Sequence, residues 1–242
     1  MIKIKEGAFL IADAHYSHKR GELLPLIEEI HSKKLQPTQL ILMGDIFDAL
    51  FGSIEHTIEN NADIVKLIND ISDSIEVIYL EGNHDFNLKD LFPKAKVFTI
   101  ENQPIITTYK DKTICLAHGD FNGDFFYRLY VSLIRNPSLL RILNSIDNYI
   151  DHYILKKLDN YLNKKDDCNE FTGFREYVEK RLSGRVTCDY FIEGHFHQNR
   201  SLEFKNFRYI NVGAFACNQR YFTVKSLEAK ELLEEKIFSK ER

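Results

Sequence analysis

Five short apolar runs in this chain each end abruptly in a cluster of aspartate, asparagine or histidine. The runs, which are rich in Ile, Leu and Val, lie at 8–12, 40–43, 77–80, 113–117 and 190–192. Runs of this kind are typical of strands that are buried on both faces. Stretches with helical spacing lie between them, such as 23–30 and 64–71. This alternation of strand and helix predicts a layered α/β domain.

The polar clusters follow the predicted strands directly. In chain order they read Asp13-Ala14-His15, Gly44-Asp45-Ile46-Phe47-Asp48, Gly82-Asn83-His84-Asp85, His118-Gly119-Asp120 and Gly194-His195-Phe196-His197. Ligand-binding loops gather at the carboxyl ends of strands in open α/β sheets. Each cluster alone is also compatible with a polar turn, but all five in this order predict one site at one edge of the sheet.

Seven side chains in these clusters are candidate metal ligands: Asp13, His15, Asp45, Asn83, His118, His195 and His197. Oxygen and imidazole donors without thiolate favour Mn, Fe, Zn or Mg over Cu(I) or an iron–sulfur centre. A tetrahedral zinc ion takes only three or four such groups. Two divalent ions that share a bridging carboxylate would use all seven, and a two-metal centre suits in-line displacement at phosphorus.

Composition excludes several other classes of protein. The 242 residues are 44% hydrophobic and 28% charged, which is typical of a globular chain, and the net charge of −4 gives no overall attraction to nucleic acid or to an acidic membrane. Cys115, Cys168, Cys188 and Cys217 form no C-x-x-C pair, so we expect reduced, buried thiols rather than a disulfide framework. The first residues do not have the pattern of a signal peptide, and no apolar run is long enough to span a membrane.

The spacing of the clusters indicates an insertion. The first three intervals each fit one strand–helix–strand unit, whereas the interval from His118 to His195 is about twice as long. We therefore expect a single domain over residues 1–242 with a helical insertion, or lid, over residues 121–190. Beyond His197 we expect strands at 208–212 and 221–225, while 232–238 fits either a strand or a helix.

The inserted segment is both apolar and cationic. Residues 125–145 include Arg128, Arg135 and Arg141 but no acidic residue, and more than half of them are Phe, Tyr, Leu, Ile or Val. Such a segment can lie on an anionic membrane surface or line an acyl-chain pocket. The alternative is a helix packed on the domain, with its arginines paired to acids within residues 147–170. Residues 146–162 form a second helical stretch with an aromatic stripe that is typical of core packing, and the next helix of the insertion would contain Phe174, Tyr177, Val178 and Leu182.

The ordered motifs resemble those of the calcineurin-like metallophosphoesterase superfamily, over about residues 8–213. The resemblance implies a four-layer α-β-β-α sandwich of two mixed sheets, with two metal ions at the strand ends and a metal-bridging hydroxide that attacks phosphorus. One ion would be held by Asp13, His15, Asp45 and His197. The other would be held by Asn83, His118, His195 and the same Asp45, which bridges the two.

The same resemblance implies two catalytic residues that are not ligands. His84 would face the substrate, where it can donate a proton to the leaving group or stabilise phosphoryl charge. Asp48 would orient His84, and the alternative role for Asp48 is a helix cap.

Within the superfamily the chain is similar to the UDP-2,3-diacylglucosamine pyrophosphohydrolases of lipid A synthesis. The shared features are the strand-end motifs, an acid and a tyrosine after His-Gly-Asp (here Asp124 and Tyr127) and a helical insertion of this size. The similarity implies hydrolysis of the pyrophosphate bond of UDP-2,3-diacylglucosamine to lipid X and UMP, with manganese as the usual metal. It also implies a cytoplasmic protein in peripheral contact with the inner membrane. The implied substrate contacts are Asn83, His84, Asp124, Tyr127, Arg128 and His195.

One departure and three alternatives accompany this similarity. Many of those enzymes carry arginine at the position of His84, and a histidine can deliver a proton whereas an arginine cannot. The main alternative is therefore a soluble phosphomonoesterase or phosphodiesterase that acts on small nucleotides. A nuclease would need a basic stripe with stacking aromatics, which is missing from this sequence. A non-catalytic scaffold of this superfamily would have lost ligands or the histidine, and this chain retains them all.

Overall fold

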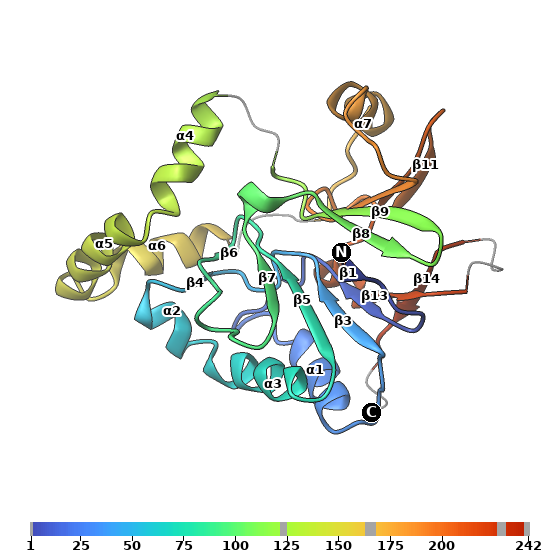
Figure 1. Cartoon of the computed structure of the whole chain (residues 1–242). Helices are drawn as coiled ribbons and strands as arrows, with labels where there is room; N and C mark the ends of the chain where they lie inside the picture. The colour runs from blue at the N-terminus through green and yellow to red at the C-terminus, as the bar shows by residue number, and fades with distance from the viewer. Residues whose placement is uncertain (1, 122–124, 163–167, 227–230, 240–242) are drawn as a thin grey trace.

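Two six-stranded sheets make up most of the fold (Figure 1). The computed structural model describes residues 2–121, 125–162, 168–226 and 231–239. The first sheet contains, in spatial order, β14 (Leu233–Ile237), β13 (Arg220–Val224), β2 (Phe9–Ile11), β3 (Gln39–Leu42), β5 (Glu76–Leu80) and β7 (Lys96–Phe98). The second contains β1 (Ile2–Lys3), β8 (Ile105–Tyr109), β9 (Lys112–Ala117), β10 (Tyr190–Glu193), β12 (Arg208–Asn211) and β11 (Arg200–Glu203).

The central strands of the first sheet are buried on both faces. β2, β3 and β5 run parallel, with Leu42 paired to Ile11 on one side and to Tyr79 on the other. Because successive side chains of a strand point to opposite faces, Leu40 and Leu42 pack against helices while Ile41 packs toward the second sheet. This double burial explains why the runs are continuously apolar, and it confirms the strands predicted there.

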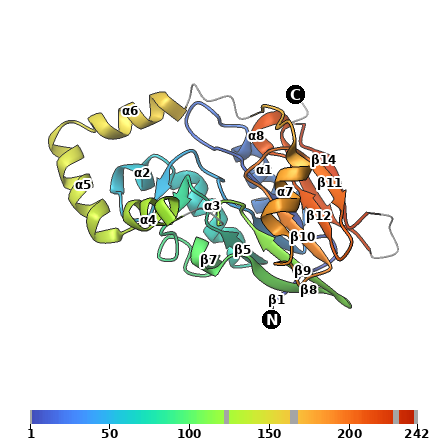
Figure 2. The ribbon, with the colours of Figure 1, turned by 90° about the horizontal axis from the view of Figure 1, so that it is seen from above.

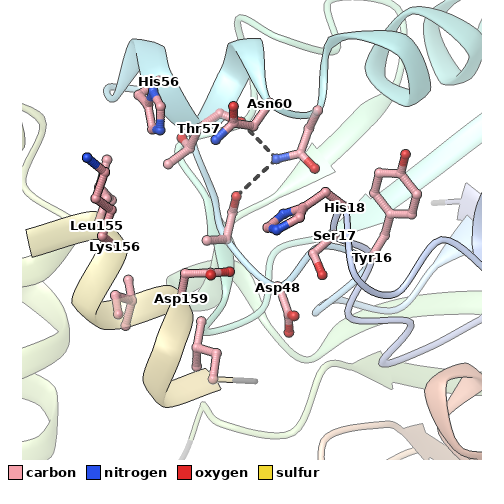
Figure 3. A pocket seen from close by; sticks show the side chains of 14 residues that line it. Tyr16, Ser17, His18, Asp48, His56, Thr57, Asn60, Leu155, Lys156 and Asp159 are labelled. Atoms are coloured by element: carbon pink, nitrogen blue, oxygen red, sulfur yellow. Dashed lines mark hydrogen bonds between the residues drawn. The ribbon is translucent and has the colours of Figure 1, made fainter. Parts of the chain in front are cut away.

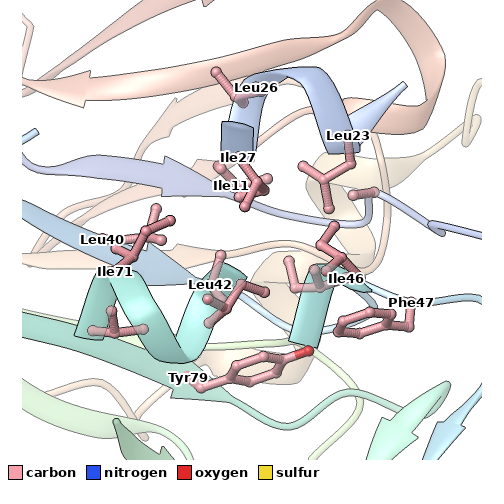
Figure 4. Packing of buried hydrophobic residues seen from close by; sticks show 14 of the residues in the cluster. Ile11, Leu23, Leu26, Ile27, Leu40, Leu42, Ile46, Phe47, Ile71 and Tyr79 are labelled. Carbon is pink, nitrogen blue, oxygen red and sulfur yellow. The ribbon is translucent and has the colours of Figure 1, made fainter. Parts of the chain in front are cut away.

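Helices cover the outer faces of the two sheets. α1 (Leu23–His31) and α3 (Ala62–Ser72) lie on the first sheet, where Leu23, Ile27 and Ile71 meet the strand side chains (Figure 4). α7 (Phe174–Leu182) packs its Val178 against the second sheet. The order helix, sheet, sheet, helix is the expected four-layer architecture.

Three further helices extend to one side of the sheets: α4 (Phe125–Ile134), α5 (Pro137–Tyr149) and α6 (Tyr153–Leu162) (Figures 1 and 2). The break between α4 and α5 was not predicted, and the boundary expected between residues 145 and 146 lies inside α5, so that the second break follows Tyr149 instead. The first occurs because Asn136 caps α5 by accepting from the N–H groups of Ser138 and Leu139, directly before a proline at the first helical position. Among the described helices, none is both long and apolar enough to cross a membrane.

The remaining elements are short. α2 (Glu55–Glu59), the 3₁₀ helix η1 (Ile100–Asn102) and α8 (Phe215–Asn218) link the larger elements, and β4 (Leu50–Phe51) pairs with β6 (Asp85–Phe86). The open choice for residues 232–238 is settled as the edge strand β14. Its three consecutive charged residues, Glu234, Glu235 and Lys236, are typical of an exposed edge.

The expectation of reduced cysteines is wrong for this structure. Cys115 is bonded to Cys188, and Cys168 to Cys217. The first pair forms because β9 and β10 are neighbours in the second sheet, although 73 residues separate the two cysteines in the sequence. Sequence spacing alone does not reveal a pairing that depends on strand order.

Candidate metal centre

The carboxyl ends of β2, β3, β5, β9 and β10 bring the five polar clusters together. Three overlapping groups of side chains place possible ligand atoms within 4.8 Å of one another: Asp13, His15 and His197; His15, Asp45 and His84; and Asp45, His118 and His195. Asn83 lies beside the third group, with its Oδ1 3.3 Å from His118 Nε2. All seven predicted ligands therefore lie at one site, with Asp45 shared between two groups.

Five of these side chains come from strained backbone. Asp13, His15, Asp45, His195 and His197 all have positive φ, between 47° and 63°. Residues other than glycine rarely adopt this region, and such strain persists only where the surrounding structure imposes it. The turns that follow the strands thus adopt a strained backbone conformation that directs these side chains toward the site.

Gly44 shows how tightly the loops pack behind the ligands. Its φ is +88°, and a Cβ at this position would lie 2.5 Å from His118 Nδ1. That ring nitrogen donates instead to the carbonyl oxygen of Met43, at 3.0 Å. Because the other hydrogen bond of a ligating histidine fixes its ring, the contact leaves His118 Nε2 directed toward Asp45.

Asp85 joins two of the ligand loops. Its carboxylate accepts from the N–H groups of Asp45 (3.0 Å), Ile46 (2.7 Å) and Gly82 (2.9 Å), and from the Tyr79 hydroxyl (2.7 Å). Burial and the Asp45 charge together raise the pKa of Asp85 to about 7. Sequence reasoning gave Asp85 no role. Its place inside the third cluster was the only signal, since its partners are mostly main-chain groups.

The ionisable groups of the site depend strongly on one another. Burial alone would raise the pKa of Asp45, but the neighbouring His118 and His84 hold that pKa well below its ordinary value. Burial would conversely lower the pKa of His118, which Asp45 and Asp120 raise well above normal. Burial and the His118 charge lower the pKa of His195 to about 3, which keeps its ring neutral. A cation between these carboxylates would displace the His118 proton.

The residues present fit divalent metal ions. Nε2 of His15 is buried and has no hydrogen-bond partner among the described residues, which is costly unless something else binds it. The donors at the site are carboxylate, amide and imidazole groups. The four cysteines form two disulfides and offer no thiolate. Such a set is typical of Mn, Fe, Zn or Mg.

His84 and Asp48 are arranged differently from the expectation. His84 Nδ1 donates to the main-chain carbonyl of Asp48 at 2.9 Å, and its Nε2 lies 3.9 Å from Asp45 Oδ2. The Asp48 carboxylate lies 3.2 Å from His15 Nδ1 instead. Asp48 thus contacts His84 through its backbone and His15 through its side chain. It caps no helix, since α2 begins only at Glu55.

An apolar cavity of about 430 Å³ begins beside the centre. His84 and Asn83 line it at the metal side, and helices α4 to α6 supply most of the rest of its wall. The lining side chains from these helices include Ile134, Leu140, Leu143, Leu155, Leu158 and Leu162. Helices α4 to α6 therefore line an apolar cavity that reaches His84, the candidate proton donor.

A smaller cavity of about 190 Å³ lies between the loop after β2, helix α2 and helix α6 (Figure 3). His18 and Asp159 lie on its wall, and Asp48 lines both this cavity and the apolar one. The Lys19 ammonium donates to Asp159 at 2.9 Å, so a bond across this gap ties α6 to the sheets.

The segment 125–145, with its three arginines, was expected to lie on a membrane, to line an acyl-chain pocket or to pair with acids within residues 147–170, and Arg135 does none of these. It lies at the junction of α4 and α5 with a side chain only 7% exposed. Its Nη2 donates to the Gly82 carbonyl at 2.7 Å, and its guanidinium pairs with Glu81 (3.4 Å) and Asp120 (3.5 Å). These partners are distant in sequence, so no local pattern could have indicated them.

The other predicted substrate contacts divide into two groups. Asn83, His84 and His195 lie at the centre as described. Asp124 falls outside the described residues, as do the side chains of Tyr127 and Arg128 on α4.

Comparison with known proteins gives three findings. The calcineurin-like phosphoesterase family matches residues 9–199. A UDP-2,3-diacylglucosamine hydrolase of Pseudomonas fluorescens (strain SBW25) is 28% identical over 153 residues, which is 62% of this chain and 61% of that protein. A UDP-2,3-diacylglucosamine hydrolase of Nitrosococcus oceani is 29% identical over 138 residues, which is 56% of this chain and 55% of that protein. The chain thus spans less than two thirds of the curated relatives that it matches.

Solved structures supply the third finding. A novel archaeal phosphodiesterase aligns with 96% of this chain and 99% of its own, at 16% identity and a TM-score of 0.46. A phosphoesterase from E. coli aligns with 90% of this chain and 88% of its own, at 13% identity and a TM-score of 0.48.

Proposed function

Because this chain belongs to the calcineurin-like phosphoesterase family, we propose that it hydrolyses phosphoesters at the cluster of side chains on the strand ends. The observation that carries the proposal is the overlap of three candidate ligand groups at one site, two of which contain Asp45. Membership of the family supports divalent metal ions as cofactors, and the donor set fits them.

The seven ligands divide naturally between two ions. Asp13, His15 and His197 would hold one, His118, His195 and Asn83 the other, and Asp45 would contribute to both. When bound, such ions activate water and neutralise charge at phosphorus. Manganese is the metal that we propose.

The side chains around the ions have separate tasks. His84 faces the apolar cavity with its Nδ1 already committed to the Asp48 carbonyl. Its Nε2 is therefore the nitrogen that can carry a proton to the leaving oxygen. Asp48 holds the His15 ring, and Asp85 fixes the loops of Asp45 and Gly82 to each other.

We propose UDP-2,3-diacylglucosamine as the substrate, cleaved at its pyrophosphate bond to lipid X and UMP. Relatives of that name support this choice. The apolar cavity supports it physically, since a space lined by leucine and isoleucine next to the metal centre suits acyl chains better than water.

We further propose that residues 121–190 form a lid within a single domain over residues 1–242, and that this lid contacts the cytoplasmic face of the inner membrane. Large apolar side chains on these helices support the contact: Phe126 is 76% exposed and Tyr149 is 91% exposed. Clusters of such residues commonly mark protein or membrane contacts.

One assay tests the substrate. The manganese-loaded protein is given UDP-2,3-diacylglucosamine or its deacylated analogue, and kcat/KM is measured for each. We expect at least about a tenfold preference for the acylated substrate, because several methylene groups of each acyl chain would be buried. Equal values would favour the alternative, a phosphodiesterase or phosphomonoesterase for small nucleotides. No turnover of any phosphoester, in a protein shown to contain the metal, would refute the hydrolase itself.

A further inference from the structure

A second cavity, of about 410 Å³, also reaches the metal centre. It shares Asn83 with the apolar cavity, but it is lined by His195 where the apolar cavity is lined by His84. The two spaces therefore approach the centre past different histidines, His195 in one case and His84 in the other. A substrate whose phosphorus lies at the centre could extend one half into each.

The wall of the second cavity is aromatic and cationic. Tyr177, Phe196 and Arg181 line it together. The Arg181 guanidinium lies 4.9 Å from the centre of the Phe196 ring and 5.8 Å from that of Tyr177. The rings thus cover the guanidinium, and Tyr177, at 39% exposed, offers an aromatic surface of the kind on which nucleobases stack.

Buried polar atoms in the same wall lack partners. Asp120 and Arg135 are 6% and 7% exposed. Among the described residues, Asp120 Oδ1 and Arg135 Nε have no hydrogen-bond partner, although Asp120 Oδ2 lies 3.5 Å from Arg135 Nη2. The acceptor Asp120 Oδ1 and the donor Arg135 Nε are thus buried without a hydrogen bond, which costs free energy that a ligand bonded to both atoms would recover.

Two of the three carboxylates that pair with the arginines do not line this cavity. Glu81 pairs with Arg135 and Glu193 pairs with Arg181, and both carboxylates are fully buried. The described lining residues therefore offer two guanidinium groups and one carboxylate, Asp120. A wall of this charge suits an anionic ligand that also has one hydrogen-bond donor.

We propose that this cavity binds the nucleoside half of the substrate, with a base that presents a carbonyl beside a ring N–H. Uracil has that edge: its carbonyl would accept from Arg135 Nε–H and its imide N–H would donate to Asp120. Cytosine lacks the N–H. The inference rests on the proposed function, because the phosphoryl group attached to the nucleoside must lie at the metal centre.

Calorimetric titration of the manganese-loaded full chain tests the proposal. The probes are UMP, CMP and ribose 5-phosphate, which share a phosphate and differ in the base. We expect UMP to bind about tenfold more tightly than ribose 5-phosphate, the size of one stacked base, and several-fold more tightly than CMP. Equal affinities for UMP and ribose 5-phosphate would overturn the proposal.

Variants on α7 locate the base. Tyr177→Ala should reduce the advantage of UMP over ribose 5-phosphate to about twofold, and Tyr177→Phe should keep it. Glu179→Ala alters an exposed neighbour on the same helix and should also keep it. An undiminished advantage in Tyr177→Ala would place the base elsewhere and overturn the assignment.

Hydrolysis of bis(p-nitrophenyl) phosphate, which has no nucleoside, is measured on the same wild-type sample. Loss of metal-dependent hydrolysis there would count against the proposed function, whereas the titrations alone decide on the nucleoside cavity.

Discussion

The edge of the sheets and the helices α4 to α6 are built in opposite ways. At the edge, Asp13, Asp45 and His118 are buried polar groups that several hydrogen bonds and charges hold in one arrangement. The helices instead place many large apolar side chains at the surface and enclose a cavity. The edge thus holds its polar groups in one arrangement, whereas the helices present an apolar surface whose contacts require no single arrangement.

This difference separates two requirements of a hydrolase. Metal ions and a proton donor must be positioned to fractions of an ångström, which buried polar networks achieve. A lipid needs only apolar surface of roughly the right shape, because hydrophobic contacts are non-directional. Four experiments test how sharply the molecule divides these tasks.

The largest effect is expected at the edge. Asp45→Ala removes the carboxylate shared by two ligand groups, so metal content should fall and kcat should drop by at least about 10³-fold. Mass spectrometry and turnover of bis(p-nitrophenyl) phosphate measure the two. Asp90→Ala, at an exposed aspartate, is the control. Full retention of two ions in Asp45→Ala would rule out the bridging position.

Stability should depend on the sheets and hardly on the helical surface. Leu42→Ala opens a space in the core between the first sheet and its helices and should lower the free energy of unfolding by about 2–5 kcal/mol. Ile146→Ala on α5, where the side chain is about half exposed, should cost less than about 1 kcal/mol. Urea unfolding followed by circular dichroism compares them. Similar losses would show that α5 is part of the main core.

His84→Ala should lower kcat by about 10²-fold while the metal content stays near that of the wild type, because a proton donor is lost and no ligand is. His84→Arg keeps a positive charge but cannot deliver a proton, so its kcat separates the two roles. His31→Ala, at a surface histidine, is the control. Wild-type turnover in His84→Ala would remove this residue from the mechanism.

The smallest effect is expected in the helices. Leu143 lines the apolar cavity and its neighbour Ile142 does not. Leu143→Asn should raise KM for the acylated substrate about fivefold, from the loss of part of the apolar contact that Leu143 would make with an acyl chain, and should leave kcat unchanged. Ile142→Asn should change neither constant. If both variants raise KM equally, the acyl chains contact the surface of α5 rather than the cavity.

The sequence alone predicted the framework of the sheets and the gathering of the clusters. Both depend on patterns that can be read locally, namely apolar runs and the polar residues that end them. The break at Asn136 was also readable in principle, since an asparagine followed by a proline is a helix start. The continuous apolar run at 40–43 was correctly taken as burial on both faces.

What the sequence did not predict depends on contacts between distant segments. Asp85 binds main-chain N–H groups, which leave no trace in residue type. Arg135 meets Glu81 and Asp120 only because α4 folds back toward the sheet edge. The disulfide between Cys115 and Cys188 likewise requires knowing that β9 and β10 are neighbours.

The buried position of Arg135 restricts how the helices can move. Lifting the α4–α5 junction away from the sheets would leave Glu81 and Asp120 without their cation, and breaking a buried ion pair costs about 3–5 kcal/mol. A fully raised lid would then account for fewer than about one molecule in a hundred. If residues 121–190 act as the proposed lid, Arg135 would stay in place while α5 and α6 move, and that movement would break the exposed ion pair between Lys19 and Asp159.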